Sequence, residues 1–266
     1  MIVFPNAKIN IGLQVLKKRV DHYHELETVF YPIKLYDVLE VIQAKEMAFY
    51  PTGISVEGDG KDNICVKAYH LLAKDYDIPA VEIHLHKNIP IGAGLGGGSS
   101  DAAFMIKLLN EKFSLGISSE KMEGYAKQLG ADCAFFIRNT PVFATGIGTD
   151  FTPLDLDLSS YHFCVVKPPI HISTAEAYQS VVPDKHGKDL KTNMNRPITE
   201  WNNTVINDFE AGIFNKYPEI ERLKKELYQA GAIYASMSGS GSSVFGIFKD
   251  QPTFLENKEN YRIFYC

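Results

Sequence analysis

Long apolar runs and blocks of basic residues are both missing from the sequence. A membrane-spanning helix needs about 18 consecutive apolar residues, and no stretch of the 266-residue chain reaches that length. Lysine and arginine total 27, aspartate and glutamate total 32, and the net charge at pH 7 is −5. Proteins bind nucleic acids mainly by neutralising phosphates, so this balance argues against a nucleic-acid partner. We therefore expect neither a membrane nor a nucleic acid among the partners.

Cysteine and histidine patterns that hold metals or form disulfides are missing as well. The four cysteines include no CxxC pair, and the eight histidines include no HExxH motif. This predicts reduced thiols and no metal ion held by protein side chains. The first ten residues lack the charged segment and apolar core of a secretory signal. Together these features predict a cytoplasmic protein.

What is present is the composition of an ordinary globular protein, with 45% apolar and 22% charged residues. Alternation of apolar and polar residues predicts strands at 7–16, 26–34, 36–43 and 81–87, with a break at Pro32. Apolar residues at helical spacing predict helices at 62–76, 99–113, 118–129 and 218–230, the first of them capped by Asp62. Further strands are predicted at 163–166 and on both sides of a glycine-serine turn within 232–248.

These segments do not alternate as regular strand-helix-strand units. They therefore predict an α+β fold of two lobes rather than a doubly wound sheet. Glycine and proline residues predict a loop over 141–158, and we place a domain boundary near residue 150. The expected domains are residues 1–150 and 151–266.

The most informative segment is the glycine loop from Pro90 to Ser100, PIGAGLGGGSS, which follows a predicted strand and opens a predicted helix. Its five glycines let the backbone approach a ligand closely with amide N–H groups turned inward. The helix adds unpaired N–H groups and the positive end of its dipole at Ser99 and Ser100. The loop is therefore expected to bind an anion, most naturally phosphate groups; the alternative is a flexible loop without a ligand.

Three well-known phosphate loops do not fit this segment. A Walker A loop requires Gly-Lys-Ser/Thr after the glycines, and that sequence is absent. Gly92, Gly94 and Gly97 match GxGxxG, but a second helix follows where a dinucleotide-binding fold needs a strand. A protein-kinase glycine loop needs a strand on both sides, whereas a helix is predicted after this loop.

Three more candidates are a polar strand face, an aspartate before an apolar run and a second glycine-rich segment. Lys8 and Asn10 lie on one face of the first predicted strand, and Asp132 precedes the apolar run Cys133–Phe136. A second glycine-rich segment, Ser236–Ser243, lies between apolar segments. Each has a plain alternative: an edge lysine, an aspartate that caps a helix, and a simple turn. In the functional reading Asp132 is a general base whose charge is held by a cation.

Together these segments resemble the GHMP kinases (galactose, homoserine, mevalonate and phosphomevalonate kinases). The segment PIGAGLGGGSSDAA resembles their phosphate loop. Four further motifs follow in the family's order: Ala7-Lys8-Ile9-Asn10, Tyr23-His24, Gly130-Ala131-Asp132 and Ser238-Gly239-Ser240-Gly241-Ser242. Within the group the resemblance is closest to members whose substrate is a cytidyl diphosphate sugar alcohol. One departure is His22, where the turn before Tyr-His usually has glycine.

The resemblance implies a two-lobe kinase with its active site in the cleft, ATP as phosphoryl donor and Mg²⁺ carried by the nucleotide. It implies that Asp132 is the catalytic base and that Lys8 stabilises this aspartate and the developing charge. Implied ATP contacts are Asn63, Lys87, Pro90, Ile91, Gly92, Ala93, Gly94, Leu95, Gly96, Gly97, Gly98, Ser99 and Ser100, with adenine near Asn63 and Lys87. Implied substrate contacts are Asn10, Tyr23, His24, Thr174, Tyr178 and Gly239, with the cytosine between Tyr23 and Tyr178.

Two alternatives stay open at this stage. One is another small-alcohol kinase of the mevalonate or homoserine type, whose substrates have no base to stack on Tyr23 and Tyr178. The other is a non-catalytic nucleotide-binding protein, which would be expected to have lost Lys8 or Asp132. The sequence does not indicate an oligomeric state.

Overall fold

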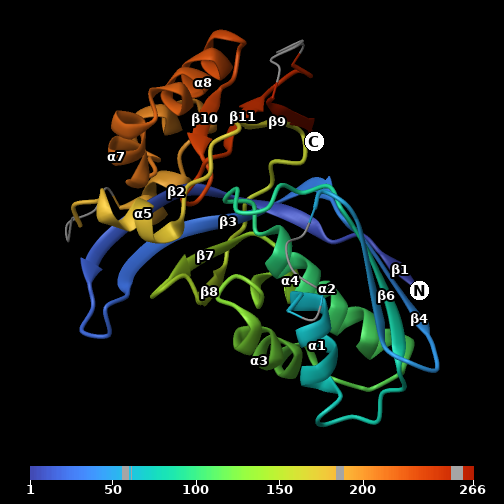
Figure 1. Ribbon diagram of the computed structural model, residues 1–266. Coiled ribbons are helices and arrows are strands. Elements are labelled where there is room, and N and C mark those ends of the chain that lie inside the picture. Colours follow the sequence, from blue (N-terminus) through green and yellow to red (C-terminus); the bar gives the residue numbers. More distant parts are fainter. Residues whose placement is uncertain (56–59, 61, 184–188, 253–259) are drawn as a thin grey trace. The chain divides into compact units, whose positions relative to one another are not determined.

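The computed structural model describes residues 1–55, 60, 62–183, 189–252 and 260–266 (Figure 1). It divides into two compact units that interleave along the chain. The first unit comprises Met1–Ala7, Lys34–Ile91 and Gly96–Thr140, and the second comprises Lys8–Ile33, Gly92–Leu95 and Pro141–Cys266. The glycine loop is therefore shared, with Gly92–Leu95 in the second unit and its flanks in the first. The domain boundary near residue 150 stays a prediction.

The first unit combines a mixed sheet with helices. In order across the sheet, its strands are β1 (Ile2–Val3), β4 (Val38–Gln43), β6 (Val81–Lys87) and β5 (Ala48–Gly53). β6 runs antiparallel to β4 and parallel to β5. The helices are α1 (Ile64–Leu72), α2 (Gly97–Lys112), α3 (Ser119–Leu129) and the short α4 (Phe135–Arg138). Helix α2 contacts β4 and each of the other three helices, so the end of the glycine loop leads directly into the core of this unit.

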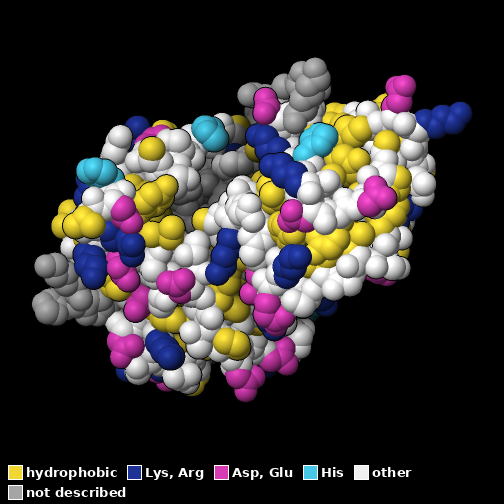
Figure 2. All heavy atoms as spheres, turned by 90° about the horizontal axis from the view of Figure 1, so that it is seen from below, with side chains coloured by type: hydrophobic (Ala, Val, Ile, Leu, Met, Phe, Trp, Pro, Cys, Tyr) yellow, Lys and Arg dark blue, Asp and Glu magenta, His cyan; other side chains and the backbone are white. Residues whose placement is uncertain are grey.

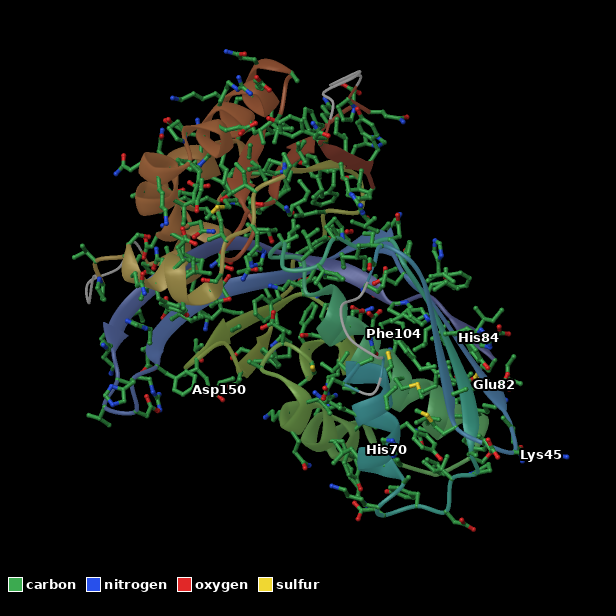
Figure 3. The ribbon with its side chains drawn as sticks, viewed as in Figure 1. Lys45, His70, Glu82, His84, Phe104 and Asp150 are labelled. Carbon is green, nitrogen blue, oxygen red and sulfur yellow. The ribbon has the colours of Figure 1, made fainter. Side chains whose placement is uncertain are left out.

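Strand β6 has the two faces that its sequence predicts. Val81, Ile83 and Leu85 are buried at 1% exposure or less. Glu82 and His84 lie on the other side of the strand, facing away from the helices (Figure 3). Because successive side chains of a strand point to opposite faces, the alternation was sufficient to predict both the strand and its orientation.

The second unit contains two sheets and the remaining helices. Most of β2 (Asn6–Lys18) and β3 (His24–Tyr36) belongs to it, in a sheet of order β2-β3-β7-β8 with β7 (Val142–Thr145) and β8 (Asp150–Pro153). The other sheet has the order β10 (Tyr234–Met237), β11 (Val244–Phe248), β9 (His162–Lys167) and β12 (Arg262–Tyr265). Its helical elements are α5 (Thr174–Gln179), α6 (Leu190–Met194), the 3₁₀ helix η1 (Ile198–Asn203), α7 (Phe209–Lys216) and α8 (Pro218–Gln229).

Helix α8 shows how this unit builds its core. Its apolar residues at helical spacing, Ile220, Leu223 and Leu227, are all fully buried and pack with residues of β10 and β11. Gly231, which has φ +97°, directly follows the last turn. Glycine accepts this left-handed conformation at little steric cost, so the helix ends where the sequence predicts.

Three local predictions were wrong. β3 runs through Pro32 and ends at Tyr36, because Asp37 leaves the strand to accept N–H bonds from Asn88 and Ile89. The predicted loop over 141–158 contains β7 and β8, whose four residues each are too few to show a period and which pair with β3 and with each other. The first helix is capped by Asn63 rather than Asp62, since the Asn63 side chain accepts the Cys65 N–H at 2.8 Å.

Charges of both signs are mixed on the surface. Figure 2 shows Lys and Arg side chains interspersed with Asp and Glu over the face in view, with apolar side chains between them. Within the described ranges, no helix has the length and apolar character needed to cross a membrane.

Candidate active site

The polar face of β2 is buried and hydrogen-bonded. Lys8 and Asn10 are 4% and 3% exposed. Lys8 Nζ donates to Asn10 Oδ1 at 2.5 Å and lies 4.5 Å from the centre of the Phe30 ring. Asn10 Nδ2 donates to Thr28 Oγ1 at 3.0 Å, and Thr28 Oγ1 donates to the Gly12 carbonyl at 2.6 Å. The chain Lys8–Asn10–Thr28 therefore fixes the ammonium in one orientation, which rules out a freely solvated edge lysine.

The two glycine-rich segments touch each other within the second unit. The Ser238 hydroxyl donates to the Gly94 carbonyl at 2.7 Å. A Cβ on Gly94 would come within 1.9 Å of the Ser238 carbonyl oxygen, and Gly94 has φ +76°. Gly239, at φ +56°, would place a Cβ 3.2 Å from Asn10 Oδ1. Only glycine allows this approach, so 236–243 is more than a simple turn.

Strand β2 is attached to both glycine segments. The Lys8 N–H donates to the Leu95 carbonyl at 3.0 Å, and the Asn10 N–H donates to Ser238 Oγ at 3.2 Å. Ser238 Oγ thus accepts one hydrogen bond and donates another. Lys8, Asn10, the turn Gly92–Leu95 and Gly239, which the sequence suggested separately, are brought together in one place.

The remainder of the glycine loop forms the N-terminus of α2 in the first unit. Gly96 precedes the helix with φ +68°, and no side chain caps the first turn. The N–H groups at this end therefore remain available, with the positive end of the dipole, for an anion. Ser100 Oγ is buried and has no hydrogen-bond partner among the described residues.

Asp132 is half-buried in the tight turn that leads into α4. The Cys133 N–H donates to the Gly130 carbonyl at 3.2 Å, and a Cβ on Gly130 would come 3.2 Å from Cys133 Sγ. Burial raises the pKa of the Cys133 thiol to about 11, although a hydrogen bond with Ser99 acts in the opposite direction. This contact holds the Asp132 turn against the start of α2. Asp132 does not cap α4, because the N-cap position is Ala134.

Lys87 and Asn63, which the resemblance assigns to adenine, have their side chains engaged inside the first unit. Asn63 caps α1 as described above. The Lys87 ammonium, 3% exposed, pairs with Asp37 Oδ2 and with Asp101 Oδ2, the latter at 2.7 Å. A Cβ on Gly97 would lie 3.3 Å from Lys87 Nζ, so this ammonium lies directly beneath the first turn of α2.

The two aspartates around Lys87 compete for one cation. Burial raises the pKa of Asp101 to about 8, with Lys87 opposing and Asp37 adding to the shift. For Lys87, burial lowers the pKa, but the two carboxylates outweigh it and the net shift is upward. We conclude that Lys87 stays charged while Asp101 binds a proton readily. Asp101 Oδ1 has no partner in the described part of the chain.

Of the residues assigned to the base, His24 and Tyr178 lie against each other. His24 and Tyr178 are stacked, with ring centres 4.6 Å apart and planes 14° apart, and Tyr178 contacts the edge of Phe209. Tyr23 is 62% exposed, so the ring that faces Tyr178 is His24. Thr174 is exposed in the first turn of α5. Burial, and to a lesser extent the charge of Lys18, lowers the pKa of His24.

Sequence reasoning missed the residues that connect these parts. Thr28, Asp37 and Asp101 are buried polar residues in apolar segments, which is a signal that could have identified them. Ser238 lay inside a recognised motif, but its bonds to Asn10 and Gly94 join segments more than 140 residues apart. Across the described ranges, no three His, Cys, Asp or Glu side chains converge as metal ligands.

Comparison with known proteins identifies the family to which the chain belongs. The GHMP kinases N terminal domain matches residues 63–140, and the GHMP kinases C terminal domain matches residues 190–258. A Bacteroides fragilis (strain YCH46) protein named 4-diphosphocytidyl-2-C-methyl-D-erythritol kinase is 53% identical over 255 residues, covering 94% of this chain and 93% of that protein. The chain belongs to this family of GHMP kinases. The protein of the same name from Azobacteroides pseudotrichonymphae genomovar. CFP2 is 55% identical and covers 94% of each chain.

Solved structures agree with this membership. A crystal structure of 4-(cytidine 5′-diphospho)-2C-methyl-D-erythritol kinase has a TM-score of 0.80 and 31% identity, and the match covers 93% of this chain and 90% of that one. The Methanococcus jannaschii mevalonate kinase has a TM-score of 0.72 at 14% identity, over 100% of this chain and 97% of that one, a likeness of fold alone. The α+β GHMP kinase fold expected from the sequence is confirmed.

Proposed function

We propose that this kinase transfers the γ-phosphoryl group of ATP to the 2-hydroxyl of 4-diphosphocytidyl-2-C-methyl-D-erythritol, giving the 2-phosphate and ADP. This is a step of the non-mevalonate route to isoprenoid precursors. Relatives more than 50% identical over nearly the whole chain carry the name of that activity. The observation that carries the proposal is the hydrogen-bonded assembly of Lys8, Asn10, Gly94 and Ser238, which joins a cationic side chain to two glycine turns.

The chemistry needs one proton acceptor and several groups that neutralise charge. Asp132 takes the proton from the 2-hydroxyl as the oxygen attacks the γ-phosphorus. The bond from that phosphorus to the β,γ-bridging oxygen breaks, and its electron pair leaves with ADP. Such transfers depend mainly on positioning and on stabilising negative charge. Lys8 and the backbone N–H groups of residues 91–100 supply the positive charge and the donors.

Asn10 and Gly239 are proposed to face the diphosphate and sugar-alcohol end of the substrate. The Asn10 side chain is oriented by Lys8 and Thr28, and the lack of a side chain at Gly239 keeps the backbone open beside it. Preorganised groups of this kind need no rearrangement when the reaction begins.

The cytosine is proposed to stack on Tyr178, with Tyr23, His24 and Thr174 around it. The His24 and Tyr178 rings already touch, so a base held between Tyr23 and Tyr178 has to displace His24 from the stack. His24 is then free to bond the polar edge of the base. Asn63 and Lys87 are proposed to lie near adenine, with contact through their backbone because both side chains are engaged.

Magnesium is proposed to arrive with the nucleotide, as it commonly does through substrate phosphates. No protein ligand is assigned to it, and no step above is routed through it. The four cysteines are free thiols, as expected in a reducing compartment, so the proposal places the reaction in the cytoplasm.

A coupled assay of ADP release tests the function. MgATP is supplied with the cytidyl substrate, mevalonate, homoserine or galactose in parallel. Turnover with the cytidyl substrate alone supports the proposal. Turnover with another alcohol keeps the kinase chemistry and rejects the base site. ATP binding without turnover on any alcohol would favour a non-catalytic protein.

A further inference from the structure

His171 lies against the glycine loop within the second unit. It belongs to the segment between β9 and α5, and its side chain is exposed. A Cβ built on Gly92 would come 2.9 Å from Cε1 and 3.2 Å from Nδ1 of His171. Gly92 has φ +60° and begins the turn Gly92–Leu95. The imidazole therefore packs on the backbone of the phosphate loop where only glycine leaves room for it.

The segment that carries His171 is held in place on both sides. Lys167 Nζ donates to the carbonyls of Pro168 and Ile170 at 2.7 and 2.8 Å. The Ser242 hydroxyl, from the second glycine segment, also donates to the Ile170 carbonyl. Ile172 is 2% exposed and packs in the core. His171 is thus an exposed ring on an anchored backbone, attached to the same glycine segments as Lys8 and Asn10.

We propose that His171 binds the polyphosphate of the nucleotide beside the turn Gly92–Leu95. Its imidazole has no hydrogen bond within the described part of the chain, so it is available to donate one to a phosphate oxygen. A ring nitrogen next to backbone N–H groups adds a directional donor to an anion site. This inference rests on the proposed nucleotide site and adds a residue that neither the glycine motif nor the family resemblance assigned.

The neighbouring segments either lack ionisable side chains or have charged groups that are engaged with other residues. This leaves the role of binding phosphate to His171. The turn Gly92–Leu95 and residues 238–243 contain no ionisable side chain. Lys167 is occupied by two carbonyls, and burial, together with the charge of Arg262, lowers its pKa. On α5, Glu176 accepts hydrogen bonds from Lys216 and Tyr217.

Equilibrium binding tests this on the whole protein. The dissociation constants of MgATP, MgADP and inorganic triphosphate are measured for wild type, His171→Ala and His171→Phe. We expect both variants to weaken binding about tenfold, the scale of one hydrogen bond to a charged phosphate oxygen. His70→Ala removes an exposed histidine on α1 (Figure 3) and should leave all constants unchanged.

The outcomes distinguish a failure of the His171 assignment from a failure of the proposed function. Unchanged constants in both His171 variants, with normal binding by wild type, overturn the His171 assignment alone. So does normal binding by His171→Phe when His171→Ala is weak, since a packed ring without a donor would then suffice. A wild-type protein that binds no MgATP overturns the proposed function itself. In the assay, KM for ATP should rise in both variants while kcat stays within about twofold.

Discussion

The hydroxyl of Ser238 donates to the carbonyl of Gly94 at 2.7 Å and ties together two glycine segments 144 residues apart in sequence. The same hydroxyl accepts the N–H of Asn10, two residues from Lys8 on β2. Three segments of the second unit therefore meet at one oxygen atom. Three of the five family motifs, which are far apart in the sequence, are thus joined through this serine.

Gly94→Ala should separate these segments. The added Cβ would lie 1.9 Å from the Ser238 carbonyl, and the left-handed backbone at φ +76° costs a non-glycine residue a further ~1–2 kcal/mol. We expect a loss of at least ~2 kcal/mol in the free energy of unfolding, measured with denaturant, and weakened ATP binding.

The matched control for that variant is Gly124→Ala in α3. No atom lies within 4 Å of a Cβ at this position, so alanine should stabilise the helix by ~0.5–1 kcal/mol. If Gly94→Ala unfolded at the same denaturant concentration as wild type, the close contact between the glycine segments would be wrong.

Asp132→Asn should abolish most of the activity while leaving the nucleotide site intact. A positioned general base typically contributes ~10²–10⁴-fold, so kcat should fall by that factor and the Kd for MgATP should hold. Asp150→Asn serves as the control, because Asp150 is an exposed residue of β8 (Figure 3). Near-normal turnover by Asp132→Asn would remove the base assignment.

The sequence alone predicted the long elements and the residue types of the site. It failed where contact with a distant segment of the chain determines the local structure. β6 and α8 were found because each has one buried face with a clear period. β7 and β8 were missed because four residues carry no period and become strands only by pairing with β3 and with each other. Pro32 suggested a break, yet the strand ends instead where Asp37 turns toward Lys87.

The same limit applies to the candidate site. Lys8, Asn10 and the glycines were identified by type and spacing, but their connections through Thr28 and Ser238 depend on tertiary contacts. The aromatic assignment shows the difference most clearly. Sequence similarity pairs Tyr23 with Tyr178, whereas the ring stacked on Tyr178 is that of the adjacent residue, His24. Which of two adjacent aromatic residues faces Tyr178 depends on the local backbone, which residue type and spacing do not determine.

Tyr178→Ala should raise the KM for the cytidyl substrate without a matching change in the KM for ATP. A stacked base is worth ~1–3 kcal/mol in nucleic-acid systems, which corresponds to roughly 5- to 150-fold. Tyr178→Phe keeps the ring and should stay near wild type. Tyr50→Ala is the control, because Tyr50 stacks on His84 at 4.7 Å in the first unit and is not among the assigned substrate residues. Equal KM values for wild type and Tyr178→Ala would show that the base does not stack there.

Asp101→Asn should flatten the dependence of stability on pH. Burial raises the pKa of Asp101 to about 8, so the folded chain holds a proton that an unfolded aspartate releases near pH 4. Stability from this group is therefore greatest at low pH and is lost as pH rises toward 8, by at most about 1.4 kcal/mol per pH unit. The free energy of unfolding, measured at pH 5, 6.5 and 8, should fall more steeply in wild type than in Asp101→Asn.

The control for the pH experiment is Asp157→Asn. Asp157 is exposed, and hydrogen bonds from Ser159 lower its pKa, so its titration falls below the pH range tested. Its removal should leave the slope between pH 5 and 8 unchanged. Identical slopes in wild type and Asp101→Asn would mean that Asp101 is already ionised across this range beside Lys87.

His22→Gly should stabilise the turn between β2 and β3. His22 has φ +66°, a conformation that costs a residue with a Cβ ~1–2 kcal/mol. Glycine removes that cost but adds ~0.5–1 kcal/mol of chain entropy, so we expect a net gain of ~0.5–1 kcal/mol and a Tm higher by ~1–4 °C. Val20→Gly, an exposed position in the same turn without a positive φ, should instead lower Tm. A Tm that fell in both variants would show that His22 makes contacts worth more than its backbone strain.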